Sequence, residues 1–286
     1  MFGLDPSAAA IKSLKSFKEK SIRNIVELGA GLGGDTVFFA KNSINVHALD
    51  YSQASIESIT NKSEKLNLTN FIKAKVFDIR KKLPFEDNSV EGCFSHMLYC
   101  MALSNSDLEN LNNEICRILK PGGINIYTVR NIDDGDYKNG THRGEGLYEN
   151  DGFIVHFFSK EKVKQLSEGF EVLDIKKFEE GKFPRKLFIV KNIKADVFGP
   201  LAFDNSISKK SAAIKGIKNA VAGQADILLV PGVETGNGLV KMMIYFMGAC
   251  AAGVVIGGKV PVVITSRSDE AQARLASIAA AVVALD

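Results

Sequence analysis

Apolar positions along the first two-thirds of the chain follow two spacings in alternation. Short apolar runs bounded by turn residues predict buried strands at residues 24–28, 44–50, 71–78, 90–95 and 124–129. Between them, apolar residues that recur every three or four positions predict helices at residues 7–20, 34–42, 52–67 and 107–119. This alternation is typical of a parallel sheet with helices on both faces, which binds ligands at the carboxyl ends of its strands.

The pattern changes after residue 130. A polar stretch from Asn131 to Gly152 predicts a loop, and residues 159–167 predict a helix. Residues 170–178 and 185–190 predict two more strands, which are close enough in sequence to form a hairpin. We expect the segment Asn131–Phe158 to lie over the strand ends as a substrate lid.

The stretch Val26–Gly34 joins the first predicted strand to the helix that follows it. Glycines permit a tight turn and a close approach of a ligand to the backbone, and the following helix N-terminus offers free N–H groups. The layout therefore predicts a nucleotide-binding turn. Because Gly29, Gly31 and Gly34 also satisfy the pattern G-x-G-x-x-G, with Asp50 at the right distance to bind a ribose, the turn alone is compatible with a dinucleotide.

Glu27 argues for S-adenosylmethionine (SAM) and against NAD. It lies two residues before Gly29, where a carboxylate would repel a pyrophosphate but would favour the ammonium and the sulfonium of SAM. Asp50 ends the second strand, where its oxygens can accept both ribose hydroxyls, and Asp78 ends the third strand, where it can accept from the adenine amino group. The three carboxylates together indicate a positively charged ligand without phosphate.

Five segments resemble, in order, the motifs of class I SAM-dependent methyltransferases: Glu27–Gly34, Leu49–Ser52, Phe77–Ile79, Leu83–Phe85 and Leu119–Gly123. The resemblance spans residues 20 to 192. It implies a Rossmann-like α/β fold with a seven-stranded sheet whose last strand is antiparallel, and it implies SAM as the cofactor.

Carried over by position, the resemblance also implies the cofactor-binding residues. The glycine turn would wrap the methionine moiety, Asp50 would take the ribose, and Asp78 with Ile79 would take the adenine. The expected cofactor-binding set is Glu27, Gly29, Ala30, Gly31, Gly33, Asp50, Tyr51, Asp78, Ile79 and Ser95.

The residues after the fourth strand should face the methyl acceptor. Ser95, His96 and Tyr99 are the candidate catalytic residues, with His96 first among them. A histidine that is merely hydrogen-bonded at a strand end is the alternative for His96. In the expected lid, His142 and Arg143 could hold an anionic group, or form a solvated pair, and Tyr148 is a further candidate substrate contact.

Composition and charge limit the classes of binding partner that the sequence supports. A net charge of +3, with no basic stripe carrying interleaved aromatics, gives no support for nucleic acid or an anionic membrane. The chain also lacks the Asn/Asp-Pro-Pro-Tyr/Phe motif of amino-methylating DNA enzymes after the fourth strand. We therefore expect a small-molecule acceptor.

The cysteines and the apolar segments bear on the cellular location of the protein. The four cysteines lie in apolar segments without metal-type spacing, so we expect reduced core residues, no metal and a cytoplasmic protein. No signal peptide is visible. The uncharged stretch Met242–Gly258 approaches the length of a membrane span, but its glycines and alanines, with Pro261 beyond, favour a buried helix followed by a buried strand.

Composition shifts near Ile193 from Lys, Asn, Ile and Phe to Ala, Gly and Val, and the shift predicts two domains, 1–193 and 194–286. The second region again reads as α/β: a strand at residues 225–230, a helix starting near Gly236, two buried strands and a last helix from Asp269. Its motifs resemble the C-terminal third of phosphate acetyl/butyryltransferases. By that resemblance Ser266 and Arg267 would form the phosphate and acyl site, with Asp269 near the proposed base and Asn237 also in this half-site.

The departure from that family is large, because its members are about as long as this whole chain and build their site between two lobes. Arginines expected from the N-terminal portion are missing. Three interpretations of residues 194–286 stay open: acyl transfer between coenzyme A and phosphate, a non-catalytic segment that forms a homodimer or docks a partner, and an artificial or misassembled fusion.

Overall fold

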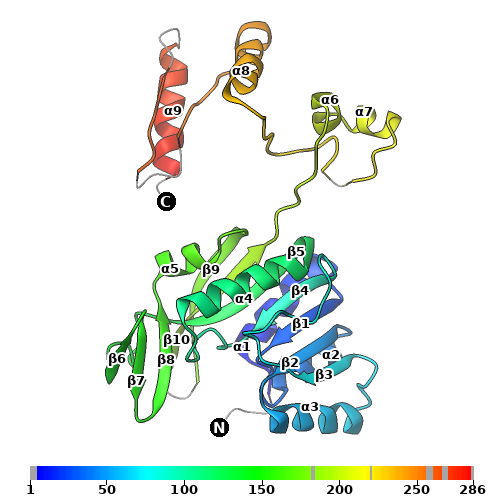
Figure 1. Cartoon of the computed structure of the whole chain (residues 1–286), viewed down its shortest axis with the longest axis vertical. Helices are drawn as coiled ribbons and strands as arrows, with labels where there is room; N and C mark the ends of the chain where they lie inside the picture. Colours follow the sequence, from blue (N-terminus) through cyan, green and yellow to red (C-terminus); the bar gives the residue numbers. More distant parts are fainter. Residues whose placement is uncertain (1–4, 182–183, 220, 256–259, 266–269, 285–286) are drawn as a thin grey trace. The chain divides into compact units, whose positions relative to one another are not determined.

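The computed structural model describes residues 5–181, 184–219, 221–255, 260–265 and 270–284. The chain divides into two compact units, Met1–Gly199 and Pro200–Asp286, and each is described by itself (Figure 1). The division expected after Ile193 stays a prediction.

A parallel sheet forms the centre of the first unit, and its strands alternate with helices as expected. In chain order the elements are α1 (Ala8–Glu19), β1 (Asn24–Leu28), α2 (Gly34–Lys41), β2 (Asn45–Asp50), α3 (Gln53–Lys65), β3 (Ile72–Val76), β4 (Val90–Ser95), α4 (Asn105–Ile118), β5 (Leu119–Asn131), α5 (Lys160–Leu166), β9 (Glu171–Glu180) and β10 (Arg185–Ile193). Serine side chains cap several helices, and Ser52 accepts a hydrogen bond from the Ser55 N–H at the start of α3, as its sequence position predicts.

Seven of the strands lie in the order β3-β2-β1-β4-β5-β10-β9. The five neighbouring strands β3, β2, β1, β4 and β5 are parallel to one another. β10, the last strand in the chain, lies between β5 and β9 and is antiparallel to both, with Phe188 opposite Val129 and Lys177. The predicted seven-stranded sheet with a reversed last strand is therefore confirmed.

Two hydrophobic clusters form the core, one on each side of the sheet. In β1 the side chains alternate: Ile25 belongs to the cluster with α1, α2 and α3, whereas Val26 and Leu28 belong to the cluster with α4 and α5. Figure 1 shows α4 lying across the strands. With both sides covered, the carboxyl ends of the strands are where backbone and polar side chains can meet a ligand.

The stretch Asn131–Gly152 is not the continuous loop that its polarity predicts, because strands form within it and continue to Phe158. These strands are β6 (Thr141–Gly144), β7 (Leu147–Asn150) and β8 (Phe153–Phe158), which we call the β6–β8 insertion. β8 pairs in parallel with Arg130 and Asn131, beyond the point where β4 ends beside β5. A sequence signal for the hairpin of β7 and β8 is the two-residue turn Asp151-Gly152. Both residues have positive φ, as hairpin turns with Asp-Gly require.

The second unit consists mostly of helices in its described residues: α6 (Phe203–Ile207), α7 (Lys209–Ile214), α8 (Val233–Met247) and α9 (Ala271–Val283). The helices expected near Gly236 and after Asp269 are present. Residues 225–230 carry no strand, and the two later expected strands lie partly outside the described residues. Among those that are described, pairing there consists of one antiparallel bridge between Val255 and Val262. A strand without a neighbour lacks partners for its N–H and C=O groups, which explains the difference.

Candidate functional site at the carboxyl ends of the strands

The glycine turn after β1 folds back onto the end of β2. Gly29, Gly31 and Gly33 all have positive φ, and the Gly29 N–H donates to the Leu49 carbonyl oxygen over 2.8 Å. A Cβ atom at Gly33 would lie 2.5 Å from Ile59 Cγ1, so this glycine lets α3 pack closely. A Cβ atom at Gly31 would meet nothing within 4 Å, which leaves that stretch of backbone open to a ligand.

Asp50 is held toward this turn by two backbone groups. One carboxylate oxygen accepts from the Gly31 N–H over 2.8 Å, and the other accepts from the Ser52 N–H over 2.9 Å. The residue is 7% exposed. Each carboxylate oxygen has a second acceptor position, so Asp50 can still accept two hydroxyl groups while the turn fixes its orientation. Tyr51, the next residue, is exposed.

Glu27 is buried beneath the turn and accepts a hydrogen bond from Thr36 Oγ1 over 2.6 Å. Burial raises the pKa of Glu27 well above its ordinary value, and the charges of Asp35 and Asp50 raise it further. The ionised form is therefore costly unless a cation lies nearby. This electrostatic environment suits a positively charged ligand and opposes a phosphate.

Asp78 follows β3 and pairs with a residue that sequence reasoning missed. Arg80 donates to both of its oxygens, at 2.9 and 2.8 Å, and these hydrogen bonds lower the pKa of Asp78 to about 2. Asp78 is therefore ionised, and a ligand amino group would share its oxygens with Arg80. Ile79 packs against the core cluster on the α4 side.

His96, just after β4, has contacts at both ring nitrogens. Nδ1 lies 3.0 Å from Thr128 Oγ1 on β5, and Nε2 lies 3.2 Å from a carboxylate oxygen of Glu180 on β9. The other Glu180 oxygen accepts from the Ala8 N–H of α1 over 2.6 Å. His96 thus links β4, β5, β9 and α1, and both of its ring nitrogens already contact protein groups.

The other two candidates after β4 are buried. Ser95 is 1% exposed, and its hydroxyl has no hydrogen-bond partner within the described residues. Tyr99 is fully buried, stacks on Tyr127 with ring centroids 4.3 Å apart, and donates to Asn112 Oδ1 over 2.7 Å. The structure therefore places the Tyr99 ring in the core, where it packs between β5 and α4.

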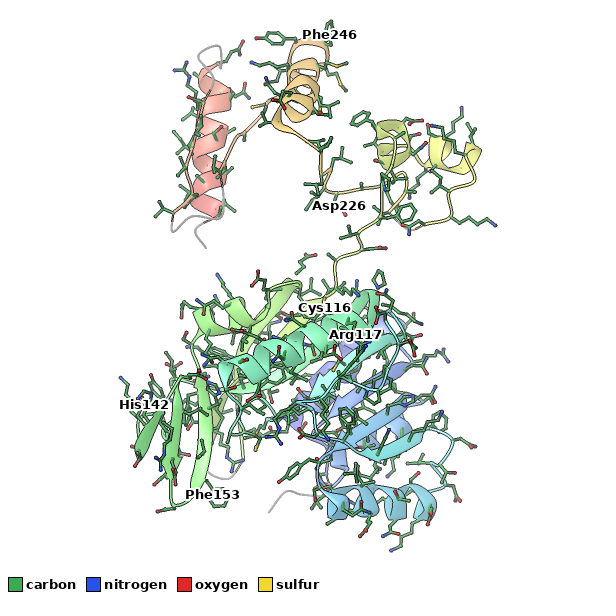
Figure 2. The ribbon with its side chains drawn as sticks, viewed as in Figure 1. Cys116, Arg117, His142, Phe153, Asp226 and Phe246 are labelled. Carbon is green, nitrogen blue, oxygen red and sulfur yellow. The ribbon has the colours of Figure 1, made fainter. Side chains whose placement is uncertain are left out.

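The candidate substrate residues lie in the β6–β8 insertion, where Figure 2 labels His142. The His142 and Tyr148 rings are 4.8 Å apart, and Tyr148 also packs near Tyr137 and Phe157. Arg143 donates to a Glu149 oxygen over 2.7 Å. Since Glu149 already neutralises Arg143, an anion would have to displace this carboxylate.

The remaining candidates belong to the second unit. Asn237 lies on α8, whereas Ser266, Arg267 and Asp269 lie outside the described residues. Among the residues that the structure does describe, no group of three His, Cys, Asp or Glu side chains could hold a metal ion. Nor does any helix in that part of the chain have the length and apolar character needed to cross a membrane.

Residues far apart in sequence complete the site, and sequence reasoning missed them. Asp35 accepts from the N–H and the hydroxyl of Ser7, at 2.6 and 2.8 Å, and so fixes the start of α1 beside α2. Thr128, Glu180 and Arg80 were also missed. Arg80 could have been found from its spacing to Asp78; Glu180 lies more than 80 residues from His96 and carries no local signal.

Comparison with protein-family models gives two matches in one chain. Residues 25–123 match the Methyltransferase domain model, and residues 182–282 match the Phosphate acetyl/butaryl transferase model. The second match includes β10, although β10 pairs with β5 and β9 in the central sheet of the first unit.

Solved structures similar to the chain include methyltransferases. A SAM-dependent methyltransferase from Methanosarcina mazei has a TM-score of 0.54 at 19% identity, with 60% of this chain and 92% of that chain covered. The 1,6-didemethyltoxoflavin-N1-methyltransferase of Burkholderia thailandensis, solved with S-adenosylhomocysteine bound, has a TM-score of 0.54 at 15% identity and covers 66% and 79%. At such identities the likeness establishes the fold.

Curated relatives match a different part of the chain. The phosphate acetyltransferase of Rhizobium meliloti is 54% identical over 83 residues, which are 29% of this chain and 26% of the relative. The phosphate butyryltransferase of Clostridium beijerinckii is 45% identical over 83 residues, with 29% and 28% covered. The chain thus spans little more than a quarter of the length of these relatives.

Proposed function

We propose that this chain, which joins a methyltransferase domain to part of a phosphate acyltransferase, binds SAM at the glycine turn and methylates a small molecule. The observation that best supports this proposal is the orientation of the Asp50 carboxylate. The Gly31 and Ser52 N–H groups hold it toward the open backbone of Gly31. In this proposal Asp50 accepts the ribose hydroxyls, Glu27 favours the positive charge of SAM, and Asp78 with Ile79 holds the adenine.

The reaction is an in-line displacement at carbon. A lone pair of the acceptor forms the new bond to the methyl carbon as the carbon–sulfur bond breaks, and the bond electrons pass to sulfur, which becomes the neutral thioether of S-adenosylhomocysteine. If the attacking atom carries a proton, that proton leaves to solvent or to a base. Since the leaving group is good, placement of the acceptor behind the methyl group supplies much of the catalysis.

The contacts of His96 favour a positioning role over proton transfer. Thr128 and Glu180 occupy both ring nitrogens, so His96 would hold the end of β4 against β9 and α1. An acceptor whose nucleophile is already unprotonated needs no base at this place. A small acceptor is further supported by the absence of the sequence features that large nucleic-acid substrates require.

Calorimetry on the intact chain with SAM, S-adenosylhomocysteine, NAD and coenzyme A tests the proposal. We expect binding of the first two and none of NAD, because the Glu27 carboxylate beneath the glycine turn would oppose its pyrophosphate. Failure to bind either SAM or S-adenosylhomocysteine would refute the cofactor. Methylated RNA or protein, with no small molecule turned over, would refute the acceptor class.

For residues 194–286 we propose self-association. The 54% identity to a phosphate acetyltransferase favours acyl transfer as a second candidate. The match covers only about a quarter of that enzyme, however, and the described residues here leave large apolar side chains uncovered: Leu229 is 98% exposed and Phe246 is 85% exposed (Figure 2). Apolar surface of this kind marks an interface.

Sedimentation of the full chain and of its Leu229→Glu and Phe246→Glu variants tests self-association. We expect a dimer that the charged variants shift to monomer, whereas Leu66→Glu, at the exposed C-cap of α3 in the first unit, should leave the dimer intact. A parallel assay of acetyl-CoA arsenolysis tests the second candidate. A monomeric full chain that consumes acetyl-CoA would reverse our preference.

A further inference from the structure

A pocket of about 520 Å³ opens where β5 ends beside the β9–β10 hairpin. It is lined by Asn131, Asp133, Lys177, Phe178, Glu179 and Lys186. This volume lies within the range of small-molecule binding sites. Because β5 runs parallel to β1 and β4, the pocket lies at the same edge of the sheet as the glycine turn.

The charges in this pocket divide into a neutralised pair and an open pair. Lys177 Nζ lies 2.7 Å from Asp133 Oδ2, so these two charges largely cancel. Lys186 and Glu179 are direct cross-strand partners of β10 and β9. Within the described residues neither of them forms an ion pair. The pocket therefore offers one ammonium and one carboxylate, both exposed, to a ligand.

Apolar and polar groups complete the lining. Phe178 supplies an aromatic ring, with Lys12 Nζ of α1 4.3 Å from its centroid. Asn131 is 1% exposed, and its side-chain oxygen accepts from the Asp133 N–H over 2.9 Å, which fixes the amide at the end of β5. The lining thus combines two opposite charges, an oriented amide and an aromatic surface.

The geometry points to a binding site for a small zwitterion, a molecule that carries both an ammonium and a carboxylate group. The carboxylate would pair with Lys186 and the ammonium with Glu179, while an apolar side group would contact Phe178. A purely anionic ligand would meet Glu179 and Asp133, and a purely cationic one would meet Lys186 and Lys177. Only a ligand with both charges satisfies both members of the open pair.

This site deepens the proposed function, on which its role as the acceptor site rests. Glu180, the neighbour of Glu179 on β9, contacts His96 at the end of β4. Glu179 and Glu180 point to opposite faces of β9, so what joins the two sites is their shared position at the carboxyl edge of the sheet, where the methyl group of SAM is expected. The inferred acceptor class is a zwitterionic amino acid or a close analogue.

Binding of matched probes to the full chain tests the site. Glycine, L-leucine and L-phenylalanine are titrated by calorimetry, alongside N-acetyl-L-phenylalanine, which lacks the ammonium, and L-phenylalaninamide, which lacks the carboxylate. We expect L-phenylalanine to bind best, and each singly charged derivative to bind about tenfold more weakly or worse, the effect of one lost charge contact.

Charge-reversal variants locate the binding. Lys186→Glu and Glu179→Lys should each weaken L-phenylalanine binding about tenfold, and the double exchange should restore it because both charges return in swapped positions. Lys75→Glu, at an exposed position of β3, is the matched control. All three side chains are exposed, and circular dichroism and thermal unfolding check that each variant folds.

The outcomes separate this site from the cofactor proposal. Equal binding of the zwitterion and its N-acetyl derivative, no restoration by the double exchange, or no zwitterion binding at millimolar concentration would each overturn the inference. S-adenosylhomocysteine is titrated on the same samples. If it binds and the zwitterions do not, the zwitterion site alone fails; if it does not bind, the cofactor proposal fails while the zwitterion titration still decides this pocket.

Discussion

Helices α4 and α8 have nearly the same length, 14 and 15 residues, but opposite relations to their surroundings. α4 buries Leu108, Leu111, Ile115 and Ile118 against the sheet and begins with a reciprocal Ser104–Asp107 cap. α8 buries none of its residues, although its sequence is the more apolar of the two. Apolar composition alone therefore does not build a core, because burial depends on a partner surface that the same chain must supply.

The same difference separates the two units. In the first, the apolar residues of β1, β2, β4 and β5 pack against helices of the same unit, and the strand ends place Glu27, Asp50 and Asp78 at one edge of the sheet. The second matches little more than a quarter of its relatives, and its apolar side chains lack the surface that would cover them. Function follows the same division, since a ligand site needs a rigid scaffold to orient its side chains.

Truncating a phenylalanine in each unit should give the largest contrast. Phe94 is fully buried and packs edge-on against Phe39, with ring centroids 5.0 Å apart. Phe94→Ala should lower the free energy of unfolding by about 3–5 kcal/mol, whereas Phe246→Ala should change it by less than about 0.5 kcal/mol. Urea denaturation followed by tyrosine fluorescence measures both. Similar losses in the two variants would mean that the second unit also has a packed core.

Removing one aspartate from each unit should separate cofactor binding from surface charge. Asp50→Ala removes the acceptors held by the glycine turn and should weaken S-adenosylhomocysteine binding by about 2–4 kcal/mol, because hydrogen bonds to a charged group each contribute about 1.5–3 kcal/mol. Asp204→Ala, which breaks only an exposed ion pair with Lys215, should leave the affinity unchanged. Calorimetry on both variants checks this, and equal affinities would place the cofactor elsewhere.

Protonation of Glu27 should make SAM binding depend on pH. Burial raises the pKa of Glu27, whereas the sulfonium of SAM favours its ionised form and so favours proton release on binding. Affinity for SAM should therefore increase as the pH rises, more steeply than for the uncharged thioether of S-adenosylhomocysteine. Calorimetry in buffers of different ionisation enthalpy counts the released protons. Glu27→Gln should abolish the dependence, and Glu64→Gln on the surface of α3 should preserve it.

Protonation of His156 should have the smallest of these effects, a change in the stability of the first unit. The ring is fully buried, with Nδ1 2.9 Å from the Leu103 carbonyl oxygen and Lys162 close to Nε2. Burial and then the Lys162 charge lower the pKa of His156. The folded state therefore favours the neutral ring, and its stability should fall as the pH drops below about 6.5 toward the lowered pKa.

Urea denaturation at pH 7.5 and 5.5 measures the His156 contribution. His156→Gln should reduce the loss of stability at pH 5.5 relative to the unchanged chain, whereas His142→Gln, at an exposed position of β6, should not. An unchanged loss in His156→Gln would assign the acid sensitivity to other groups.

Local pattern was sufficient for the first unit's main elements. The alternating apolar spacings predicted the order of strands and helices from residue 7 to residue 129, and the proximity of the last two strands indicated their hairpin. The loop predicted for the polar stretch after Asn131 is wrong, because charged and aromatic residues of this stretch pair with one another in the β6–β8 insertion. The strand expected at residues 225–230 is absent for the opposite reason: its residues suit a strand, but no strand in the described part of the second unit lies beside it to pair with it.

By itself, the sequence determined the fold class of the first unit and the positions of Glu27, Gly31, Asp50 and Asp78 at successive strand ends, since these depend on periodicity and on turn chemistry within a few residues. Only the tertiary structure decided the contacts of His96 with Thr128 and Glu180, the burial of Tyr99, and the open pair of Lys186 and Glu179. Those depend on strands that are distant in sequence and adjacent in the sheet, and hydrogen bonds and charges act through that spatial proximity.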